Sequence, residues 1–292
     1  MHEPAAALYA EVRHGYLPPM ASKKRNGVPM ARVADKYKLY LDSVQSPDHE
    51  VEFFDRAFRA EFDRRPLVLR EDFCGTAAVC CEWVKSKSDR TALGVDLDPE
   101  PLSWGTENLM PSLKNGARQR IKLLEADVRD VRGPKADVVA AQNFSFYLFK
   151  TRDALKKYFR AAYRNLGKEG VLILDMLGGP EAMEDDNEEI KRQRGYKYVF
   201  EQQWFDPISH HCRFWIHFRF PDGSELKRAF GYEWRLWTIP EVREILEEAG
   251  FEESKVYWEN TDSETGEGNG VYCVRKKAES DATWVSYIVA RK

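Results

Sequence analysis

The feature that most constrains the fold is a series of short apolar runs that alternate with amphipathic segments from Pro66 onward. Such runs are typical of strands buried on both faces, because neither face then carries polar residues. Between the last two runs, apolar residues recur at helical spacing over residues 155–166. Strands that alternate with helices predict an α/β fold with a parallel sheet and crossover helices. The runs are residues 67–69, 92–95, 121–124, 137–141 and 171–174.

Residues 195–237 have a different pattern, in which apolar and polar side chains alternate. This alternation is typical of strands with one buried face, and Pro221-Asp222-Gly223 supplies a turn between two of them. We expect a small antiparallel insertion with one aromatic-rich face. It could serve as a lid, as part of a substrate site or as a dimer surface, so a homodimer is a possible assembly.

The chain before the sheet divides into two parts. Residues 1–31 are rich in proline and basic residues, which favours a poorly ordered arm, with a flap that orders on binding as the alternative. Ser46 and Pro47 are typical of an N-cap and a first helical residue, and apolar residues follow at helical spacing. We expect residues 1–64 to form an arm and a helix that cover the site, and residues 65–292 to form the main domain.

Three later segments complete the organisation. The charged run at 181–194 is typical of a solvated, mobile segment, with a lid as its alternative. Residues 238–241 form a capping box that predicts a helix after the insertion. Residues 256–258 and 284–289 have the pattern of two final strands, joined by a polar stretch at 260–281 that is long for a hairpin.

Composition disfavours several classes of partner. Lys and Arg number 45 against 48 Asp and Glu, a net charge of −3, so no global positive field attracts nucleic acid. The five cysteines lack the CxxC spacing of zinc or redox sites, which predicts reduced thiols and no metal. Neither a secretory signal nor an apolar stretch of about 20 residues is present. We therefore expect a cytoplasmic protein without a membrane partner.

Acidic residues stand where the first two predicted strands end. Glu71 follows the first strand and opens a turn in which Gly75 allows close backbone approach and Thr76 keeps the turn small. Asp96 ends the second strand, 21 positions after Gly75, close to the ~20-residue offset of a carboxylate that binds a ribose. Asp98 precedes a proline and is interpreted as a helix cap.

The next two strand ends carry further candidates. Asp127, with the amide of Val128, could pair with an adenine edge, although a solvated aspartate is an equally good interpretation. Asn143 and Phe144 lie in an amide- and aromatic-rich segment at 142–147, either beside a reaction centre or in packing beneath a loop.

This series of motifs resembles class I S-adenosylmethionine-dependent methyltransferases, in a layout similar to those that act on small molecules. The resemblance implies a Rossmann-like, seven-stranded, mostly parallel sheet whose last strand is antiparallel, with the cofactor at the ends of the first strands. The matching segments are residues 67–77, 94–102, 125–128, 136–146 and 167–176. The cofactor-binding residues carried over are Arg70, Glu71, Phe73, Gly75, Thr76, Asp96, Leu97, Asp127, Val128, Asn143 and Phe144.

The first motif departs from the family's three-glycine turn, since Phe73 and Ala77 occupy the outer positions. Phe73 could redirect the turn or form an apolar wall near the methionine part of the cofactor. Arg70 could pair with Glu71 or meet the cofactor's carboxylate.

The family's chemistry is an in-line displacement at an activated methyl group, which needs positioning more than a catalytic triad and yields S-adenosylhomocysteine. Candidates for substrate handling are Tyr37, Tyr40, Tyr147, Trp204, His210 and His211, although exposed histidines without a catalytic task fit their turn-like context better. We expect methyl transfer to nitrogen, oxygen or carbon of a small molecule. The alternatives are a protein or RNA methyltransferase and a noncatalytic nucleoside-binding module.

Overall fold

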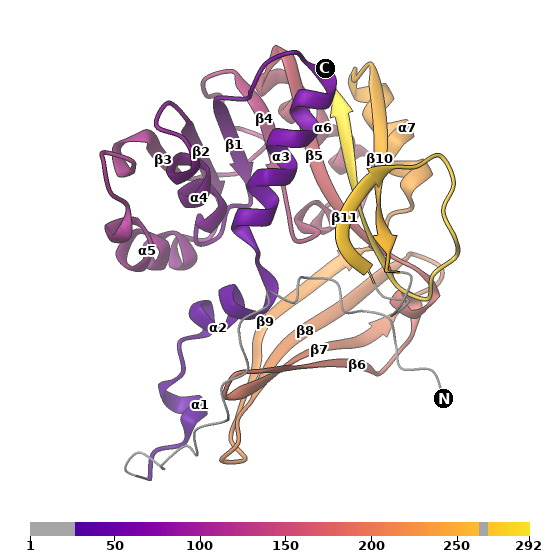
Figure 1. Ribbon diagram of the computed structural model, residues 1–292. Helices are drawn as coiled ribbons and strands as arrows, with labels where there is room; N and C mark the ends of the chain where they lie inside the picture. The colour runs from indigo at the N-terminus through magenta and orange to yellow at the C-terminus, as the bar shows by residue number, and fades with distance from the viewer. Residues whose placement is uncertain (1–26, 263–267) are drawn as a thin grey trace.

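Two sheets make up the fold in the computed structural model, which describes residues 27–262 and 268–292 (Figure 1). The larger sheet has eight strands in the order β11-β10-β12-β5-β4-β1-β2-β3, and the smaller has the order β6-β7-β8-β9. The larger sheet's strands are β1 (Val68–Asp72), β2 (Thr91–Asp96), β3 (Ile121–Glu125), β4 (Ala136–Ala141), β5 (Leu166–Gly178), β10 (Glu253–Thr261), β11 (Gly268–Val274) and β12 (Trp284–Arg291). The predicted arm at 1–31 lies almost entirely outside the described residues.

The larger sheet confirms the predicted α/β class and its mostly parallel order. Strands β1 to β5 pair in parallel, and β12 inserts antiparallel against β5. The sheet has one strand more than the seven predicted, because part of the 260–281 stretch forms β11 and pairs with β10. Tyr272 explains this addition: it is buried, and its ring packs 4.7 Å from that of Tyr287 and 6.0 Å from that of Phe53.

Helices cover both faces of the larger sheet. Helices α3 and α4 pack on the face that carries Leu69 and Ile173, whereas α6 and α7 pack on the face that carries Leu172 and Leu174. The helices are α1 (Met30–Val33), α2 (Lys36–Val44), α3 (Pro47–Glu61), α4 (Ala78–Ser86), α5 (Pro99–Asn108), α6 (Arg152–Asn165) and α7 (Ile239–Ala249), with short 3-10 turns η1 (Met110–Ser112), η2 (Arg118–Arg120), η3 (Ser145–Leu148) and η4 (Pro180–Met183).

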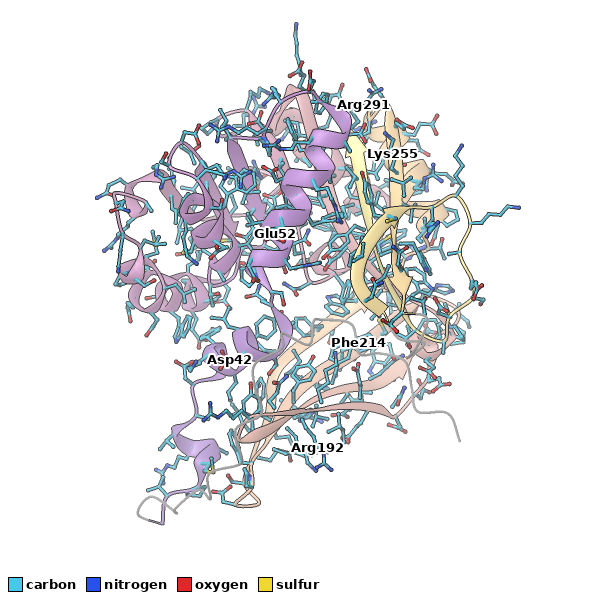
Figure 2. The ribbon with its side chains drawn as sticks, in the orientation of Figure 1. Asp42, Glu52, Arg192, Phe214, Lys255 and Arg291 are labelled. Carbon is cyan, nitrogen blue, oxygen red and sulfur yellow. The ribbon has the colours of Figure 1, made fainter. Side chains whose placement is uncertain are left out.

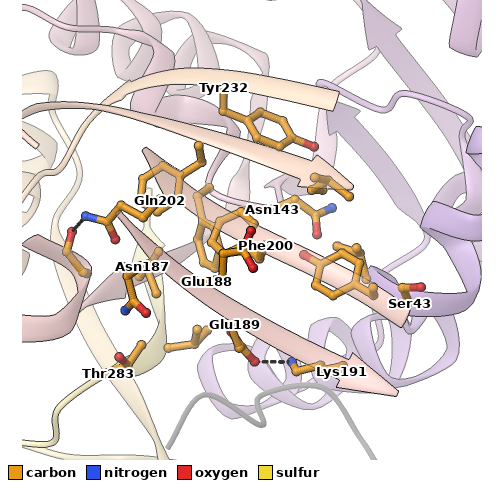
Figure 3. Close-up of a pocket in the computed structure, with 18 of the residues that line it drawn as sticks. Ser43, Asn143, Asn187, Glu188, Glu189, Lys191, Phe200, Gln202, Tyr232 and Thr283 are labelled. Carbon is orange, nitrogen blue, oxygen red and sulfur yellow. Dashed lines mark hydrogen bonds and ion pairs between the residues drawn. The ribbon is translucent and has the colours of Figure 1, made fainter. Parts of the chain in front are cut away.

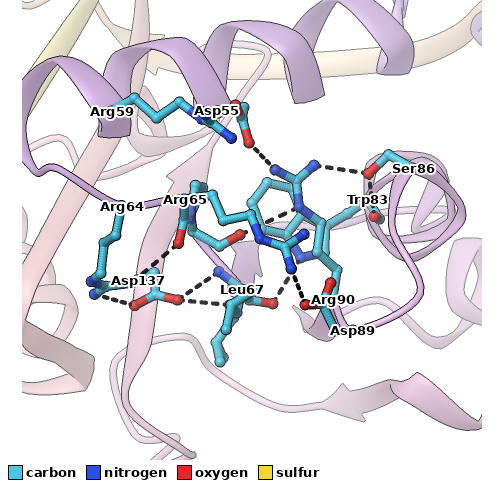
Figure 4. Close-up of polar contacts among 12 residues, drawn as sticks. Asp55, Arg59, Arg64, Arg65, Leu67, Trp83, Ser86, Asp89, Arg90 and Asp137 are labelled. Atoms are coloured by element: carbon cyan, nitrogen blue, oxygen red, sulfur yellow. Dashed lines mark hydrogen bonds and ion pairs between the residues drawn. The ribbon is translucent and has the colours of Figure 1, made fainter.

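Helix α3 runs across the sheet from its carboxyl edge to its amino edge. Just beyond the end of the helix, Arg64 donates to Asp137 of β4 at 2.7 Å, which fixes that end beside the start of the strand (Figure 4). Arg90 is also buried in this region, where it pairs with Asp55 of α3 and lies 3.9 Å above the ring of Trp83 of α4. The opposite end of α3, near Pro47, therefore lies over the carboxyl ends of the parallel strands.

The smaller sheet is the predicted antiparallel insertion, but it begins earlier than residue 195. Its strands are β6 (Asn187–Gln193), β7 (Tyr196–Phe205), β8 (His211–Arg219) and β9 (Glu225–Arg235). The interpretation of 181–194 as a mobile segment is wrong for residues 187–193, because β6 pairs with β7 along its whole length, while the alternative of a lid stays a prediction. Its charges suit an edge strand: Glu188 accepts from Arg219 at 2.7 Å, while alternate residues point to the other face.

The predicted turn and helix signals are confirmed around this sheet. Gly223 has φ 81° in the turn between β8 and β9. The side chain of Thr238 accepts from the Glu241 amide at 3.4 Å, and Glu241 accepts from the Thr238 amide at 2.9 Å, completing the capping box of α7. Gly250, with φ 110°, ends that helix.

Candidate cofactor and acceptor site

The turn after β1 has the backbone conformation that favours glycine, although only one of its three key residues is glycine. Phe73, Gly75 and Ala77 have φ of 59°, 50° and 59°. A left-handed conformation costs a residue with a side chain roughly 1–2 kcal/mol, so the surrounding structure must hold the turn. The ring of Phe73 packs 5.5 Å from that of Tyr158 in the core.

Asp96 holds this turn against the end of β2. Its carboxylate accepts from the amide of Gly75 at 2.7 Å and from that of Asp98 at 2.9 Å. Each carboxylate oxygen retains a lone pair, so the group can still accept from two ribose hydroxyls. Asp98 caps α5 by accepting from Glu100, as predicted. Leu97 is 69% exposed and leaves an apolar side chain beside the carboxylate.

Glu71 and Thr76 are buried parts of the same turn. Glu71 accepts from the amide of Cys80 at 3.0 Å, in the first turn of α4. Burial raises the pKa of Glu71 to about 7, although its bonds to Cys80 act in the opposite direction. Helix α5 crosses the turn closely at Gly105, where an added Cβ would lie 2.0 Å from the Thr76 carbonyl oxygen. The turn is therefore clamped between two helices and β2.

Arg70 pairs with Asp72 and not with Glu71 as one sequence interpretation suggested. Successive side chains of a strand point to opposite faces, so Arg70 and Asp72 share a face that Glu71 does not. The guanidinium donates to Asp72 at 2.7 Å and to the carbonyls of Val128 and Val131 at 2.7 and 3.1 Å. The side chain is 1% exposed. Arg70 thus supports the loop after β3 from beneath.

That loop carries Asp127, which is paired and not simply solvated. Its carboxylate accepts from the Arg129 guanidinium at 2.9 and 2.6 Å, and this interaction holds the pKa of Asp127 below its usual range. Val128 is buried. The contact of Asp127 and Val128 with an adenine edge stays a prediction.

A residue outside the predicted site set, Asp175 of β5, shapes the loop after β4. Asp175 is fully buried and accepts from the amides of Asn143 and Phe144 at 2.7 and 2.9 Å. Both of these residues have positive φ, 57° and 55°. Burial raises the pKa of Asp175 to about 7, against the effect of those hydrogen bonds. The sequence signal was an acid at the end of an apolar run, as at Glu71 and Asp96.

An aromatic-lined cavity lies between this loop and the inner face of the smaller sheet (Figure 3). Phe214 points from β8 toward the larger sheet (Figure 2). The polar groups in the cavity include Asn143, Gln202 and an ion pair of 3.2 Å between Glu189 and Lys191. The aromatic lining consists of Tyr40, Phe144, Tyr198, Phe200, Phe214, Tyr232 and Trp234. The aromatic face therefore points inward and is not the exposed surface that a dimer contact through it would need.

Of the predicted candidates for substrate handling, only Tyr40 is among the described residues that line this cavity. Tyr147 is buried and its hydroxyl donates to the Leu177 carbonyl at 2.8 Å, while burial raises its pKa well above the usual value. His210 directly precedes β8 and His211 is the first residue of that strand, and neither lines the cavity. Tyr37 lies nearer the cofactor side, where its ring is 5.6 Å from that of Trp104 in α5.

Helix α2 connects the two sides of the site. Asp35 caps the helix and also accepts from the indole of Trp104 at 2.8 Å, and Lys36 pairs with Glu100 at 2.8 Å. From the same helix, Tyr40 packs on Phe230 of β9 at 4.9 Å. The N-terminal segment thus contacts both α5, beside Asp96, and the smaller sheet.

The residues at this edge fit S-adenosylmethionine chemically. Asp96 offers acceptors for ribose hydroxyls, and Leu97 offers an apolar surface beside them. Buried carboxyls at Glu71 and Asp175 suit a ligand that carries positive charge. Among residues 27–262 and 268–292, no group of three or more His, Cys, Asp or Glu side chains could hold a metal ion.

Comparisons with known proteins support the same class. The chain is 25% identical over 199 residues to a putative methyltransferase, YqeM, of Bacillus subtilis (strain 168), covering 65% of this chain and 76% of the relative. A S-adenosylmethionine-dependent methyltransferase from Clostridium acetobutylicum ATCC 824 superposes with a TM-score of 0.62 at 18% identity, over 87% of this chain and 96% of that one. CalS10, an amino pentose methyltransferase from Micromonospora echinaspora, bound to the cofactor, gives 0.61 at 18% identity, over 87% and 95%.

No protein-family profile matches the chain. The predicted fold is nevertheless confirmed by these likenesses: the chain has the fold of S-adenosylmethionine-dependent methyltransferases. Within the described part of the chain, no helix is long and apolar enough to cross a membrane.

Proposed function

We propose that this protein transfers a methyl group from S-adenosylmethionine to a small molecule held in the aromatic-lined cavity, and releases S-adenosylhomocysteine. The observation that carries the proposal is the position of the cavity. It is lined by Asn143 and Phe144, which follow β4 at the same sheet edge where Asp96 and Gly75 hold the cofactor turn. An acceptor in the cavity would therefore lie beside the cofactor.

When bound, the cofactor supplies a methyl group already activated by its positively charged sulfur. The work left to the protein is to orient the acceptor and to exclude water. Asp175 fixes the Asn143–Phe144 loop by two hydrogen bonds, and the aromatic rings of the smaller sheet provide an apolar wall. The acceptor atom can be nitrogen, oxygen or carbon, and a base is needed only if that atom carries a proton to be removed.

Two features favour a small acceptor over RNA or protein. The cavity lies between two sheets and is covered in part by α2, through Tyr40, Ser43 and Val44. The net charge of −3 gives no general attraction for a phosphate backbone. The amino pentose activity of one structural neighbour is in line with an acceptor of this size.

The test has two stages. Calorimetry should show that the wild-type chain binds S-adenosylmethionine and S-adenosylhomocysteine. The enzyme and cofactor with a radiolabelled methyl group are then incubated in three separate reactions. One contains a small-metabolite extract, one contains total RNA and one contains total cell protein. We expect label in the metabolite fraction. Label only in RNA or protein would contradict the small-molecule proposal, and cofactor binding without any methylated product would favour the noncatalytic module.

A further inference from the structure

A layer of buried polar side chains lies at the carboxyl edge of the larger sheet, under the start of α3. Glu71 and Asp175 point to the α3 face of the sheet. Each lies two positions after a core residue on that face, Leu69 and Ile173, and side chains two positions apart in a strand point to the same face. Gln142, just after β4, donates to the Ile173 carbonyl at 3.4 Å. Glu50 belongs to the buried side of α3. These four side chains are Glu50, Glu71, Gln142 and Asp175, and each is at most 4% exposed.

Two acceptors in this layer lack a donor. Oε2 of Glu50 and Oε1 of Gln142 have no hydrogen-bond partner among the residues that the structure describes. Glu71 and Asp175, by contrast, accept from backbone amides. A buried acceptor without a partner costs about 1–3 kcal/mol, and more when it is charged. When Glu50 is ionised, both orphaned atoms are acceptors, so the group that satisfies them must be a donor.

The electrostatics of the layer favour a donor that is also a cation. Burial raises the pKa of Glu50 well above its usual value, and the carboxyls of Glu71, Asp175 and Asp48 raise it further. The negative charge of Glu50 in turn raises the pKa of Tyr40 on α2. Among the described residues, neither Lys, Arg nor His acts on Glu50 in this cluster. A bound ammonium group would supply both the N–H donors and the missing positive charge.

We propose that Glu50 and Gln142 bind the α-ammonium group of the cofactor's methionyl part. This inference rests on the proposed function. Glu50 is close enough to feel the charge of both Glu71, at the start of the proposed cofactor turn, and Asp175, which holds the loop that lines the cavity. The methionyl part has to pass between these two places if the ribose lies at Asp96 and the methyl group faces the cavity. A primary ammonium has three N–H donors, enough for both orphaned acceptors.

The experiment compares three ligands by calorimetry on the full chain. S-adenosylmethionine and S-adenosylhomocysteine carry the α-ammonium, whereas 5′-methylthioadenosine lacks the whole amino-acid part. Glu50→Gln keeps the shape of the side chain and removes its charge. We expect it to weaken binding of the first two ligands about tenfold and to leave 5′-methylthioadenosine unchanged. The matched control is Glu52→Gln on the exposed side of the same helix (Figure 2), which should change none of the three affinities.

A second readout follows the proton. A cation beside Glu50 lowers the pKa of that carboxyl, so wild-type protein should release protons on binding S-adenosylmethionine, measured from binding heats in buffers of different ionisation enthalpy. Glu50→Gln should release fewer, since its amide does not titrate. Gln142→Leu should weaken binding of the two ligands that carry the ammonium group several-fold, and it should change proton release less than Glu50→Gln does. If Glu50→Gln fails to fold, Glu50→Asp, which keeps the charge and shortens its reach, takes its place.

Four outcomes would overturn the proposal. Unchanged affinity of Glu50→Gln for S-adenosylmethionine and unchanged proton release would each contradict it. An equal loss of affinity for 5′-methylthioadenosine would indicate a structural role for Glu50. An effect confined to the KM of the acceptor would assign the Glu50 carboxylate to an acceptor amine. A wild-type chain that binds none of the three ligands is a different result, since it contradicts the proposed function itself.

Discussion

The proposed cofactor side and the proposed acceptor side of this site are built in different ways. On the proposed cofactor side, each functional group stands near the end of one parallel strand, such as Glu71 as the last residue but one of β1 and Asp96 as the last residue of β2. On the proposed acceptor side, the antiparallel strands β7, β8 and β9 and helix α2 contribute to one aromatic wall. A strand end is a local feature of the chain, whereas the wall exists only once the strands pair. Local sequence motifs therefore specify the strand-end groups, whereas the aromatic wall depends on the tertiary fold.

The two sides also differ in what their interiors contain. The cofactor side buries carboxyl groups, among them Glu71 and Asp175. The acceptor side stacks rings, with Phe200 and Phe214 at 4.9 Å and Tyr232 and Trp234 at 4.6 Å. Buried ionisable groups stabilise the folded state less than buried apolar groups do, and their protonation responds to the charge of a ligand. Stacked rings, by contrast, provide apolar burial and a fixed shape. We therefore expect pH and cofactor to act mainly on the first side.

The largest expected effect is on stability as the pH changes. The folded-state pKa of Glu71 and of Asp175 is about 7, above the ordinary carboxyl range. A raised pKa means that the folded protein holds protons that the unfolded chain releases, so stability is greatest below about pH 4 and is lost as the pH rises through 7. The two groups predict a slope on the order of 2 kcal/mol per pH unit between pH 5 and 6. Urea unfolding across this range measures it, and Asp175→Asn should flatten it.

This prediction tests the cofactor side alone. Unfolding free energy that stays constant or rises between pH 5 and 6 would show that these carboxyls are ionised in the folded protein. A saturating concentration of S-adenosylmethionine should reduce the slope, because its positive charge favours the ionised carboxyls.

The next effect is the loss of cofactor affinity in Asp96→Ala. Two charge-assisted hydrogen bonds to ribose hydroxyls are worth about 1.5 kcal/mol or more each, which predicts a loss of affinity of about 100-fold. Calorimetry with S-adenosylmethionine measures it. Asp98→Ala is the matched control, because Asp98 caps α5 and should change stability by about 1 kcal/mol with little change in affinity. Equal losses in both variants would mean that α5 and not the Asp96 carboxylate carries the effect.

The acceptor side should respond to Glu189→Gln. Glu189 lines the cavity and pairs with Lys191, and the variant removes the negative charge from an apolar surrounding. We expect the KM for the identified acceptor to rise about tenfold while the affinity for S-adenosylmethionine stays unchanged. The control is Glu225→Gln, which pairs with Arg219 and does not line the cavity. A change in cofactor affinity would break the separation of the two sides.

The smallest effect concerns the strained turn. Ala77→Gly removes a buried methyl group but relieves a left-handed conformation, and the two effects of about 1 kcal/mol offset each other. We expect stability within about 0.5 kcal/mol of wild type. Ala57→Gly, at an equally buried site inside α3, has no strain to relieve and should lose about 1–2 kcal/mol. Urea unfolding of both variants measures the difference, and similar losses would show that the turn stores no strain.

The sequence specified more of the cofactor side than of the acceptor side. Strand ends, the Asp98 cap and the parallel order follow from local patterns, and all three are confirmed. Asp175 was outside the predicted set because an acid after one apolar run does not reveal that it bonds to a loop after another strand. Arg70 pairs with Asp72 because alternate side chains of a strand point to the same face. Pairing Arg70 with its sequence neighbour Glu71 does not take this alternation into account.

On the acceptor side, the sequence indicated antiparallel strands and an aromatic face but not where that face points. Charge at 181–194 obscured β6, because an edge strand carries polar residues toward solvent. The cavity needs Tyr40 from α2, Phe144 from the larger sheet's edge and Trp234 from β9. Residues so far apart in the chain meet only through the packing of the two sheets.

The turn at Phe73, Gly75 and Ala77 has a consequence for how kinship in this fold is recognised. Its backbone keeps the left-handed conformation at all three positions although two of the glycines are replaced. A pattern that requires glycine there passes over such a chain, while the shape of the backbone still identifies it. At this turn, therefore, glycine is one way to adopt left-handed dihedral angles and not a requirement for them.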